Sequence, residues 1–265
     1  MEDMTQTILI GDIHGCLHEF RDLLDKVGYT AGDRVICVGD FMDKGPYQAE
    51  CVQFARANQI EAVSGNHDAL HVRWRHREKA RMLLGRPNNM RKLSQLDAAA
   101  HELLSDEDVE WLAKLPRILP FQSDGVSWVV VHGGLFPYAL EKQPPDDVMY
   151  IRWLKDGKNV PIDYNKPETL GRAPEGAQHW TALWPGLESV VYGHEAFSLT
   201  EPLHTVKPTG VECWGIDTGA VHGGRLTALI LNGDGQKRIV QVQARQKYME
   251  PPVNIPLTLP PVAEL

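Results

Sequence analysis

The chain carries, directly after the apolar run Ile8-Leu9-Ile10, the pentapeptide Gly11-Asp12-Ile13-His14-Gly15. A short apolar strand that ends in a carboxylate and an imidazole two residues apart delivers two metal-type ligands to one place. The flanking glycines allow the backbone to turn sharply there. Gly-Asp is also a common turn dipeptide, so the pentapeptide by itself decides little. The pentapeptide becomes informative because apolar runs followed by a glycine and a ligand-type side chain recur downstream.

Further apolar runs also end in a glycine and a polar donor. Including the first run, the donors at these ends are Asp12, His14, Asp40, Asn66, His132 and His194. Hard oxygen donors and imidazoles without thiolates suit manganese, iron or zinc rather than copper or an iron–sulfur cluster. Two metals about 3.5–4 Å apart need a ligand that bridges them, and a carboxylate such as Asp40 can do so.

The local patterns predict an α/β protein. Apolar residues in the range 17–27 mark one helical face, and Gly28 is predicted to end that helix. Another helix is predicted over 47–58, after the strand 34–38. Strands that share a polar edge are typical of a mostly parallel sheet. The runs at 225–231 and 238–242, joined by a glycine-rich turn, predict an antiparallel hairpin.

We expect one domain over residues 1–250 and a proline-rich extended tail at 251–265. Residues 69–118 are rich in Arg, Leu and Ala, and they predict a helical, cap-like insertion beside or over the site. Residues 141–185 are rich in Pro and Gly and are interpreted as long surface loops.

Composition is that of an ordinary globular protein. The chain has 265 residues, of which 43% are hydrophobic and 23% are charged. No apolar run approaches the ~20 residues of a membrane helix. The start Met1-Glu2-Asp3 lacks the layout of a secretory signal, and the four cysteines show no CxxC spacing. We therefore expect reduced cysteines, a cytoplasmic location and no membrane partner.

The net charge of −8 argues against extended nucleic-acid binding. Residues 73–92, however, contain eight basic residues and one acid, Glu78. The basic residues are Arg73, Arg75, Arg77, Lys79, Arg81, Arg86, Arg91 and Lys92. The segment is interpreted either as a solvated helix face or as a surface that faces a polyanion. The sequence does not indicate an oligomeric state.

Five ordered motifs resemble a known signature. GDIHG, GDFMDKG, GNHD, VHGG and VYGH, within residues 8–231, are similar in order and spacing to calcineurin-like metallophosphoesterases. The resemblance is closest to the bacterial phosphoprotein-phosphatase type, which includes the symmetrical dinucleoside tetraphosphatases. Ala196, in place of a second histidine, favours this branch over relatives with a GHxH motif. The resemblance implies a four-layer α/β/β/α sandwich, with two mixed sheets flanked by helices and a helical insertion.

The resemblance also implies a dinuclear site. The first metal would take Asp12, His14 and Asp40, and the second would take Asp40, Asn66, His132 and His194. The metals would be two divalent ions, manganese in the first place, with iron or zinc as options. A metal-bridging hydroxide would attack phosphorus in line, without a phosphoenzyme. His67 matches the proton donor to the leaving oxygen, oriented by Asp43.

The expected contacts to the substrate phosphate come from Lys44, Arg152 and Asn66. Lys44 stands where the family usually has Arg, and an ammonium cannot fork across two phosphate oxygens. Arg152, in Tyr150-Ile151-Arg152-Trp153, is the candidate for the other cation.

Three functions are compatible with these features. The main expectation is a phosphatase for phosphoserine or phosphothreonine in proteins, because Asp43 is present in the GDxxDxG motif and some tetraphosphatase relatives lack it. The alternative is a hydrolase of dinucleoside polyphosphates or other nucleotide anhydrides, favoured by the basic segment. A non-catalytic, metal-stabilised binding module is disfavoured, because His67 and Asp43 would then have no role.

Overall fold

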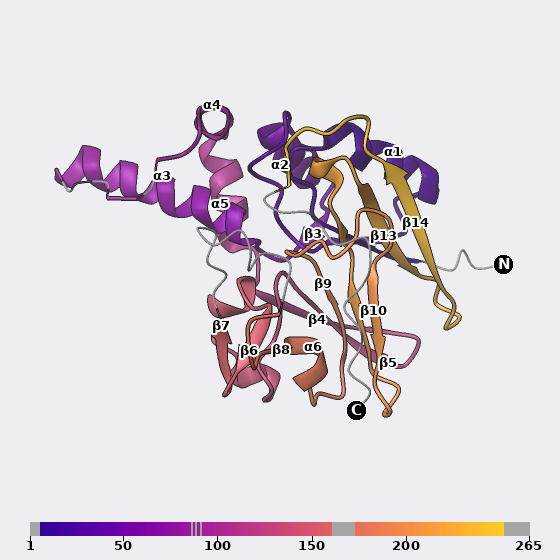
Figure 1. Cartoon of the computed structure of the whole chain (residues 1–265). Helices are drawn as coiled ribbons and strands as arrows, with labels where there is room; N and C mark the ends of the chain where they lie inside the picture. Colours follow the sequence, from indigo (N-terminus) through magenta and orange to yellow (C-terminus); the bar gives the residue numbers. More distant parts are fainter. Residues whose placement is uncertain (1–5, 86, 88, 91, 161–172, 252–265) are drawn as a thin grey trace.

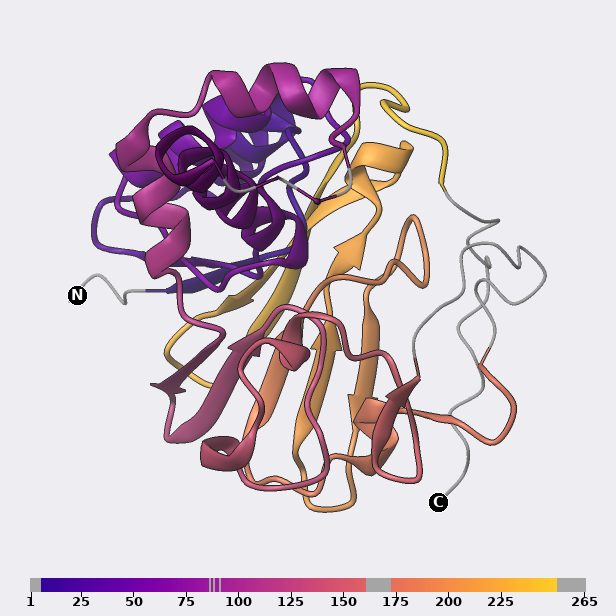
Figure 2. The same ribbon diagram turned by 90° about the vertical axis from the view of Figure 1, so that its left-hand side faces the viewer.

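The computed structural model describes residues 6–85, 87, 89–90, 92–160 and 173–251. The predicted tail, apart from Pro251, lies outside these residues, as do Arg86 and Arg91 of the basic segment. Two β-sheets form the centre of the described structure, and most of the helices gather on one side of them (Figures 1 and 2).

The first sheet has the strand order β12-β13-β1-β2-β3, with β14 also paired to β13. Its strands are β1 (Thr7–Ile10), β2 (Arg34–Cys37), β3 (Glu61–Ala62), β12 (Asp217–Thr218), β13 (Arg225–Leu231) and β14 (Lys237–Gln243). Strands β1, β2 and β3 run parallel, whereas β13 pairs antiparallel with β1 and β14. The predicted hairpin is confirmed, and the sheet is mixed.

The second sheet has the order β10-β11-β9-β5-β4. Its strands are β4 (Ile118–Ser123), β5 (Val126–Val131), β9 (Ser189–Tyr192), β10 (Leu203–Val206) and β11 (Glu212–Gly215). The three central strands are parallel and the two outer strands are antiparallel to their neighbours. Pro120 lies in the outer strand β4, where a missing N–H is tolerated.

The two sheets pack face to face through an apolar layer. Leu9 and Ile36 of the first sheet share this layer with Trp128 and Val130 of the second. Side chains alternate along a strand, so Ile8 points the other way, toward the helices. The strand ends are thereby fixed from both faces, which is what a rigid site at those ends requires.

Three helices cover the outer face of the first sheet. They are α1 (Leu17–Val27), α2 (Gln48–Ala57) and α5 (Asp106–Lys114). Helix α1 has the predicted bounds, and Gly28 ends it in the left-handed conformation, with φ of 78°.

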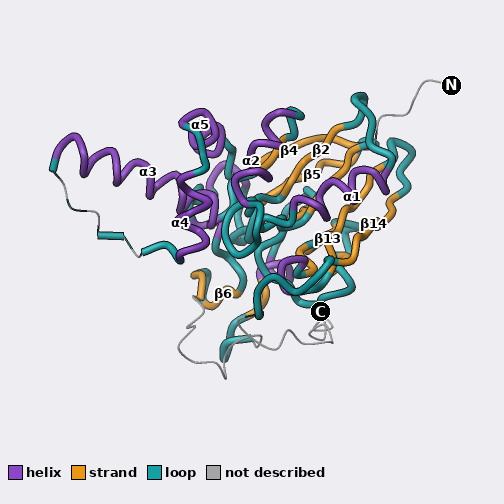
Figure 3. Tube along the Cα trace, turned by 90° about the horizontal axis from the view of Figure 1, so that it is seen from above, coloured by secondary structure: helices purple, strands orange, loops and turns teal. Residues whose placement is uncertain are grey.

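The helical segment comprises α3 (Asn66–Leu84), α4 (Gln95–Glu102) and α5. Helix α3 starts three residues earlier than the predicted insertion, directly at the site. Its far end projects beyond the rest of the described structure (Figures 1 and 3). Strand β4 begins at Ile118, so the last residue of the predicted helical insertion lies in a strand instead. The domain boundaries themselves remain predictions.

A layer of short elements and loops covers the outer face of the second sheet. It contains β6 (Trp153–Lys155), β7 (Lys158–Val160), β8 (Gln178–His179), α6 (Trp180–Leu183) and the 3₁₀ turns Leu140–Lys142 and Asp147–Met149. The interpretation of 141–185 as surface loops was therefore wrong where these short elements lie, and residues 161–172 of that segment lie outside the described residues. Trp180 and Trp184 are buried against the sheet, and this apolar anchoring organises a glycine- and proline-rich stretch.

Candidate metal centre

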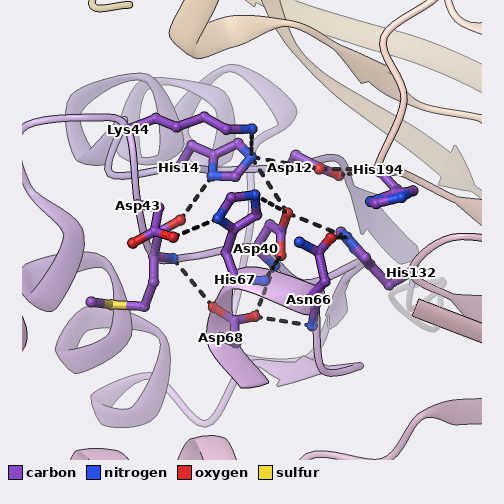
Figure 4. Close-up of polar contacts among 12 residues, drawn as sticks. Asp12, His14, Asp40, Asp43, Lys44, Asn66, His67, Asp68, His132 and His194 are labelled. Atoms are coloured by element: carbon purple, nitrogen blue, oxygen red, sulfur yellow. Dashed lines mark hydrogen bonds and ion pairs between the residues drawn. The ribbon is translucent and has the colours of Figure 1, made fainter. Parts of the chain in front are cut away.

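The six predicted donors lie together at one edge of the two sheets (Figure 4). They follow the ends of β1, β2, β3, β5 and β9. The parallel strands of each sheet end at a common edge, so residues far apart in sequence meet there. Open α/β folds use this edge for chemistry because loops there are positioned by a rigid scaffold.

Asp40 lies at the middle of the cluster. Its Oδ2 is 3.4 Å from His14 Nε2 and 3.3 Å from His132 Nε2. Its Oδ1 accepts a 3.0 Å hydrogen bond from the backbone N–H of His67. Burial raises the pKa of Asp40, but the imidazoles of His132 and His67 outweigh it and hold the pKa well below its ordinary value. A carboxylate with an imidazole on either side is placed to bridge two cations.

The first group of donors contains Asp12 and His14. The Nδ1–H of His14 donates to the carbonyl of Met42 over 2.8 Å, so its Nε2 presents a lone pair to the centre. That nitrogen is 3.9 Å from Asp12 Oδ2. The ammonium of Lys44 lies 2.8 Å from the same nitrogen. A positive group already faces this lone pair, which fits a position that favours a cation.

The second group contains Asn66, His132 and His194. His132 Nδ1 faces the carbonyl of Val38 at 2.8 Å, and its Nε2 is 3.1 Å from Asn66 Oδ1. The Nε2 of His194 is buried and has no hydrogen-bond partner among the described residues. Its ligand atom lies within 4.8 Å of those of Asp40 and His132. A buried, unpaired imidazole nitrogen is costly unless a metal takes its lone pair, so the donor set fits a divalent cation.

The backbone around the centre is unusual. Five non-glycine residues here have positive φ, namely His14 (44°), Asp40 (53°), Asp43 (64°), Lys44 (73°) and His194 (72°). Such conformations cost free energy and gather where a site imposes them. Glycine is also required at two positions, because the backbone there lies close to a carboxylate of the site. A Cβ on Gly193 would overlap the carboxylate of Asp12, and one on Gly65 would overlap that of Asp40.

His67 and Asp43 form a close pair beside the centre. Asp43 Oδ2 accepts from His67 Nδ1 over 2.5 Å, and His67 Nε2 lies 4.0 Å from Asp40 Oδ2. Burial raises the pKa of Asp43, but hydrogen bonds from His67 and His71 outweigh it and hold the pKa below its ordinary value. His67 also falls within one group of potential metal ligands with His14 and Asp40. Its role as proton donor stays a prediction.

Arg152 flanks the second group of donors. Its Nη2 donates to the carbonyl of His194 over 3.4 Å, and its Nε lies 3.6 Å from Glu195 Oε2. Burial raises the pKa of Glu195 to about 7 despite this arginine. Lys44 therefore lies beside the His14 ring, and Arg152 lies beside the backbone of His194. Their contact with a phosphate remains a prediction.

Sequence reasoning gave no role to Asp68, which is fully buried. Its carboxylate accepts from the backbone N–H groups of Asp40 (2.8 Å), Phe41 (2.9 Å), Gly65 (3.1 Å) and Met42 (3.2 Å). It ties the loop that carries Asp40 to the start of α3. The signal was available, because Asp68 stands three residues after Gly65, where a helix-capping carboxylate is typical.

The basic segment is partly paired. Arg75 and Lys79 contact Asp106 at 2.9 Å and 3.1 Å, and Arg73 Nη2 donates to the Tyr150 hydroxyl over 3.2 Å.

Among the residues that the structure describes, none of the helices has the length and hydropathy needed to cross a membrane.

Comparison with known proteins gives a consistent result. The family profile described as calcineurin-like phosphoesterase matches residues 5–197. The chain is 28% identical over 243 residues to the bis(5'-nucleosyl)-tetraphosphatase PrpE [asymmetrical] of Bacillus mycoides, covering 83% of this chain and 88% of that protein. It is also 28% identical over 275 residues to the symmetrical bis(5'-nucleosyl)-tetraphosphatase of Chromohalobacter salexigens, covering 85% and 94%. A crystal structure described as "a putative diadenosine tetraphosphatase" superposes with a TM-score of 0.67 at 26% identity, covering 91% and 95%.

Proposed function

Because this chain belongs to the calcineurin-like phosphoesterase family, whose members use a dinuclear divalent metal centre, we propose that it hydrolyses dinucleoside polyphosphates of the diadenosine tetraphosphate type. In this reaction a P–O bond of the phosphate chain breaks, the oxygen of water bonds to phosphorus, and the leaving oxygen takes a proton.

The observation that carries the hydrolase assignment is the position of Asp40 Oδ2 between two imidazoles. When bound, two divalent ions supply Lewis-acid charge and lower the pKa of coordinated water. The residues proposed to hold them are Asp12, His14, Asp40, Asn66, His132 and His194. Manganese is the first choice on this donor set, with iron or zinc as options.

The side chains around the ions have separate roles. Lys44, beside His14, and Arg152, beside His194, offset negative charge on the phosphate chain. Asn66 contacts the phosphate as well as a metal. His67, oriented by Asp43, gives a proton to the leaving oxygen.

The choice of substrate rests on the relatives and on the surroundings of the centre. The main expectation from the sequence, a phosphoserine or phosphothreonine protein, has less support than its alternative, because the curated relatives are named for dinucleoside tetraphosphates. Cations beside two different histidines of the proposed metal centre, His14 and His194, suit a multiply charged phosphate chain. Tyr150 is 38% exposed, and its ring lies edge-on to His194 with centroids 6.5 Å apart. It offers a face on which a nucleobase can stack.

One assay panel tests the proposal. The purified chain, stripped of metal and reloaded with manganese, is offered diadenosine tetraphosphate, a phosphoserine or phosphothreonine peptide, and 4-nitrophenyl phosphate. We expect kcat/KM to be at least tenfold higher for the dinucleotide than for the peptide. Anion-exchange chromatography then shows whether the products are two ADP or ATP plus AMP. Preparations of Asp40→Asn control for contaminating phosphatases.

A higher kcat/KM for the phosphopeptide would overturn the proposal in favour of a protein phosphatase. Metal binding without turnover of any substrate would favour the non-catalytic module. Parallel reloading with iron or zinc identifies the ion that gives the highest turnover.

A further inference from the structure

Asp43 binds two histidines, although the proposed function uses only one of them. Asp43 Oδ2 faces His67 Nδ1 at 2.5 Å, and Asp43 Oδ1 faces His71 Nε2 at 2.6 Å. The two histidines are four residues apart in α3 and therefore lie on the same face of that helix. His71 is fully buried. Both oxygens of the carboxylate are thus held, one on each imidazole.

The chain of contacts continues into α4. His71 Nδ1 lies 3.0 Å from Nδ1 of His101, whose side chain is buried. Arg75, one further turn along α3, places its Nε 3.3 Å from His101 Nε2. Its Nη2 also donates to the carbonyls of His101 (3.2 Å) and Leu104 (3.1 Å). The guanidinium is fixed by these bonds and by Asp106.

Arginine determines the direction of these hydrogen bonds, because a guanidinium only donates. His101 Nε2 must accept from Arg75, so the proton of neutral His101 is on Nδ1. His71 Nδ1 must then accept, which leaves His71 with its proton on Nε2, donating to Asp43. The remaining oxygen of Asp43 accepts from His67 Nδ1, and His67 Nε2 faces the metal centre.

The surroundings of His101 support this assignment of donors and acceptors. Burial lowers the pKa of His101 to about 4, and the neighbouring His71 and Arg75 act in the same direction. A neutral ring can accept from Arg75. Glu78 Oε2 lies 3.5 Å from the same His101 nitrogen, farther away than Arg75 Nε at 3.3 Å, and it could accept from His101 only if Nε2 carried a proton.

We propose that His71, held by His101 and Arg75, is a positioning residue that fixes Asp43 and, through it, aims His67 at the leaving oxygen. The inference rests on the proton-donor role of His67 in the proposed function. A carboxylate with one free oxygen can rotate, whereas one held at both oxygens keeps its partner imidazole in a single orientation. His71, His101 and Arg75 thus contribute to the reaction without touching the substrate.

Leaving-group dependence separates this role from a merely structural one. The variants are His71→Leu, His71→Gln, whose amide can still donate to Asp43, and the control His76→Leu, at an exposed histidine of the same helix. The substrates are 4-nitrophenyl phosphate and phenyl phosphate. The leaving oxygen of phenyl phosphate is the more basic of the two, so its departure depends more on a proton donor. All variants are the full chain loaded with manganese, and their metal content is measured.

For His71→Leu we expect kcat on phenyl phosphate to fall about 10- to 100-fold, with KM changed less than about threefold. On 4-nitrophenyl phosphate the fall should be less than about threefold. His71→Gln should recover most of the loss, and His76→Leu should match the unchanged protein. An equal loss on both substrates, or no loss on either, overturns the proposal.

A spectroscopic measurement covers the case in which His71→Leu does not fold. In the unchanged protein, loaded with diamagnetic zinc and labelled with ¹⁵N-histidine, ring nitrogen shifts report the tautomers. We expect the Nε2–H form at His71 and the Nδ1–H form at His101, and the reverse pattern overturns the inference. Neither measurement uses a dinucleotide. Failure to hydrolyse diadenosine tetraphosphate would therefore refute the proposed function alone.

Discussion

The carboxylate of Asp68 accepts a 2.8 Å hydrogen bond from the backbone N–H of Asp40. Its other oxygen accepts from the N–H of Phe41 over 2.9 Å. Asp40 has a φ of 53°, a conformation that is unfavourable for a residue with a side chain. Asp68 thus stabilises the strained turn from which the central carboxylate of the site projects.

Asp68→Asn should weaken metal binding. An amide NH₂ in place of one oxygen would face backbone N–H groups and leave them unpaired. We expect the manganese Kd of the stripped protein, measured by calorimetry, to rise at least about tenfold, and stability to fall by about 1–3 kcal/mol. Asp108 is the matched control, since it caps the start of α5 from the same position, outside the centre. Asp108→Asn should lower stability without changing the Kd, and an unchanged Kd in Asp68→Asn would contradict this role.

Asp40→Asn should disrupt both metal positions. Asp40 Oδ2 faces both His14 and His132, so removing its charge weakens each group of ligands. We expect metal content, measured by mass spectrometry, to fall below one ion per chain, and kcat to fall by about 10³-fold or more. The control is Asp124→Asn, in the exposed turn between β4 and β5, where asparagine tolerates the φ of 52°. Two retained ions in Asp40→Asn would argue against a bridging role.

Lys44→Arg should leave activity intact or raise it. A guanidinium can fork across two phosphate oxygens, whereas the ammonium of Lys44 acts as a point charge. Steady-state kinetics on diadenosine tetraphosphate should show an unchanged or higher kcat/KM, and Lys44→Met should lower it. A large loss of turnover in Lys44→Arg would refute the placement of Lys44 at the phosphate.

Tyr150→Ala should weaken binding of a dinucleotide but not of a simple aryl phosphate. Stacking of a base on an aromatic ring is worth about 1–3 kcal/mol, so KM for diadenosine tetraphosphate should rise at least about fivefold. KM for 4-nitrophenyl phosphate should stay within about twofold. Tyr150→Phe keeps the ring and removes only the bond to Arg73, so it should behave like the unchanged protein. Equal effects on both substrates would exclude base stacking at this position.

His101 should make stability depend on pH. Its pKa is about 4 in the folded protein, below the ordinary value of 6.5. Between pH 4 and pH 6.5 the unfolded chain binds more protons at this residue than the folded chain does. The stability that depends on a neutral His101 is therefore fully present above pH 6.5 and is lost as the pH falls toward 4. The slope from one such group is at most about 1.4 kcal/mol per pH unit.

Urea unfolding from pH 4.5 to 7.5 measures this slope. The unchanged protein should lose more stability on acidification than His101→Gln does. Burial and the neighbouring Asp40 raise the pKa of Asp68 to about 6, which acts in the opposite direction, but this effect is present in both proteins and cancels in the comparison. Equal slopes would show that His101 does not titrate in this range.

The parts of the fold with strong local patterns were predictable. Helix α1 and strand β13 have the predicted bounds. An apolar periodicity that ends at a glycine defines α1, and an apolar run followed by a glycine-rich turn defines β13. Strands β4 and β10 were missed. Both are outer strands with mixed exposure, and their pairing with β5 and β11 rather than their own pattern makes them strands.

The sequence by itself determined which donors stand at the strand ends, because a buried strand followed by glycine, aspartate or histidine is a local pattern. It also indicated the family, through five motifs in order. Only the tertiary structure decided that one oxygen of Asp40 faces His14 and His132, and that His71 and His101 continue the pair formed by Asp43 and His67. Those contacts join residues that are 26 to 92 positions apart. Their geometry depends on how two sheets and an inserted helical segment pack, which no local periodicity encodes.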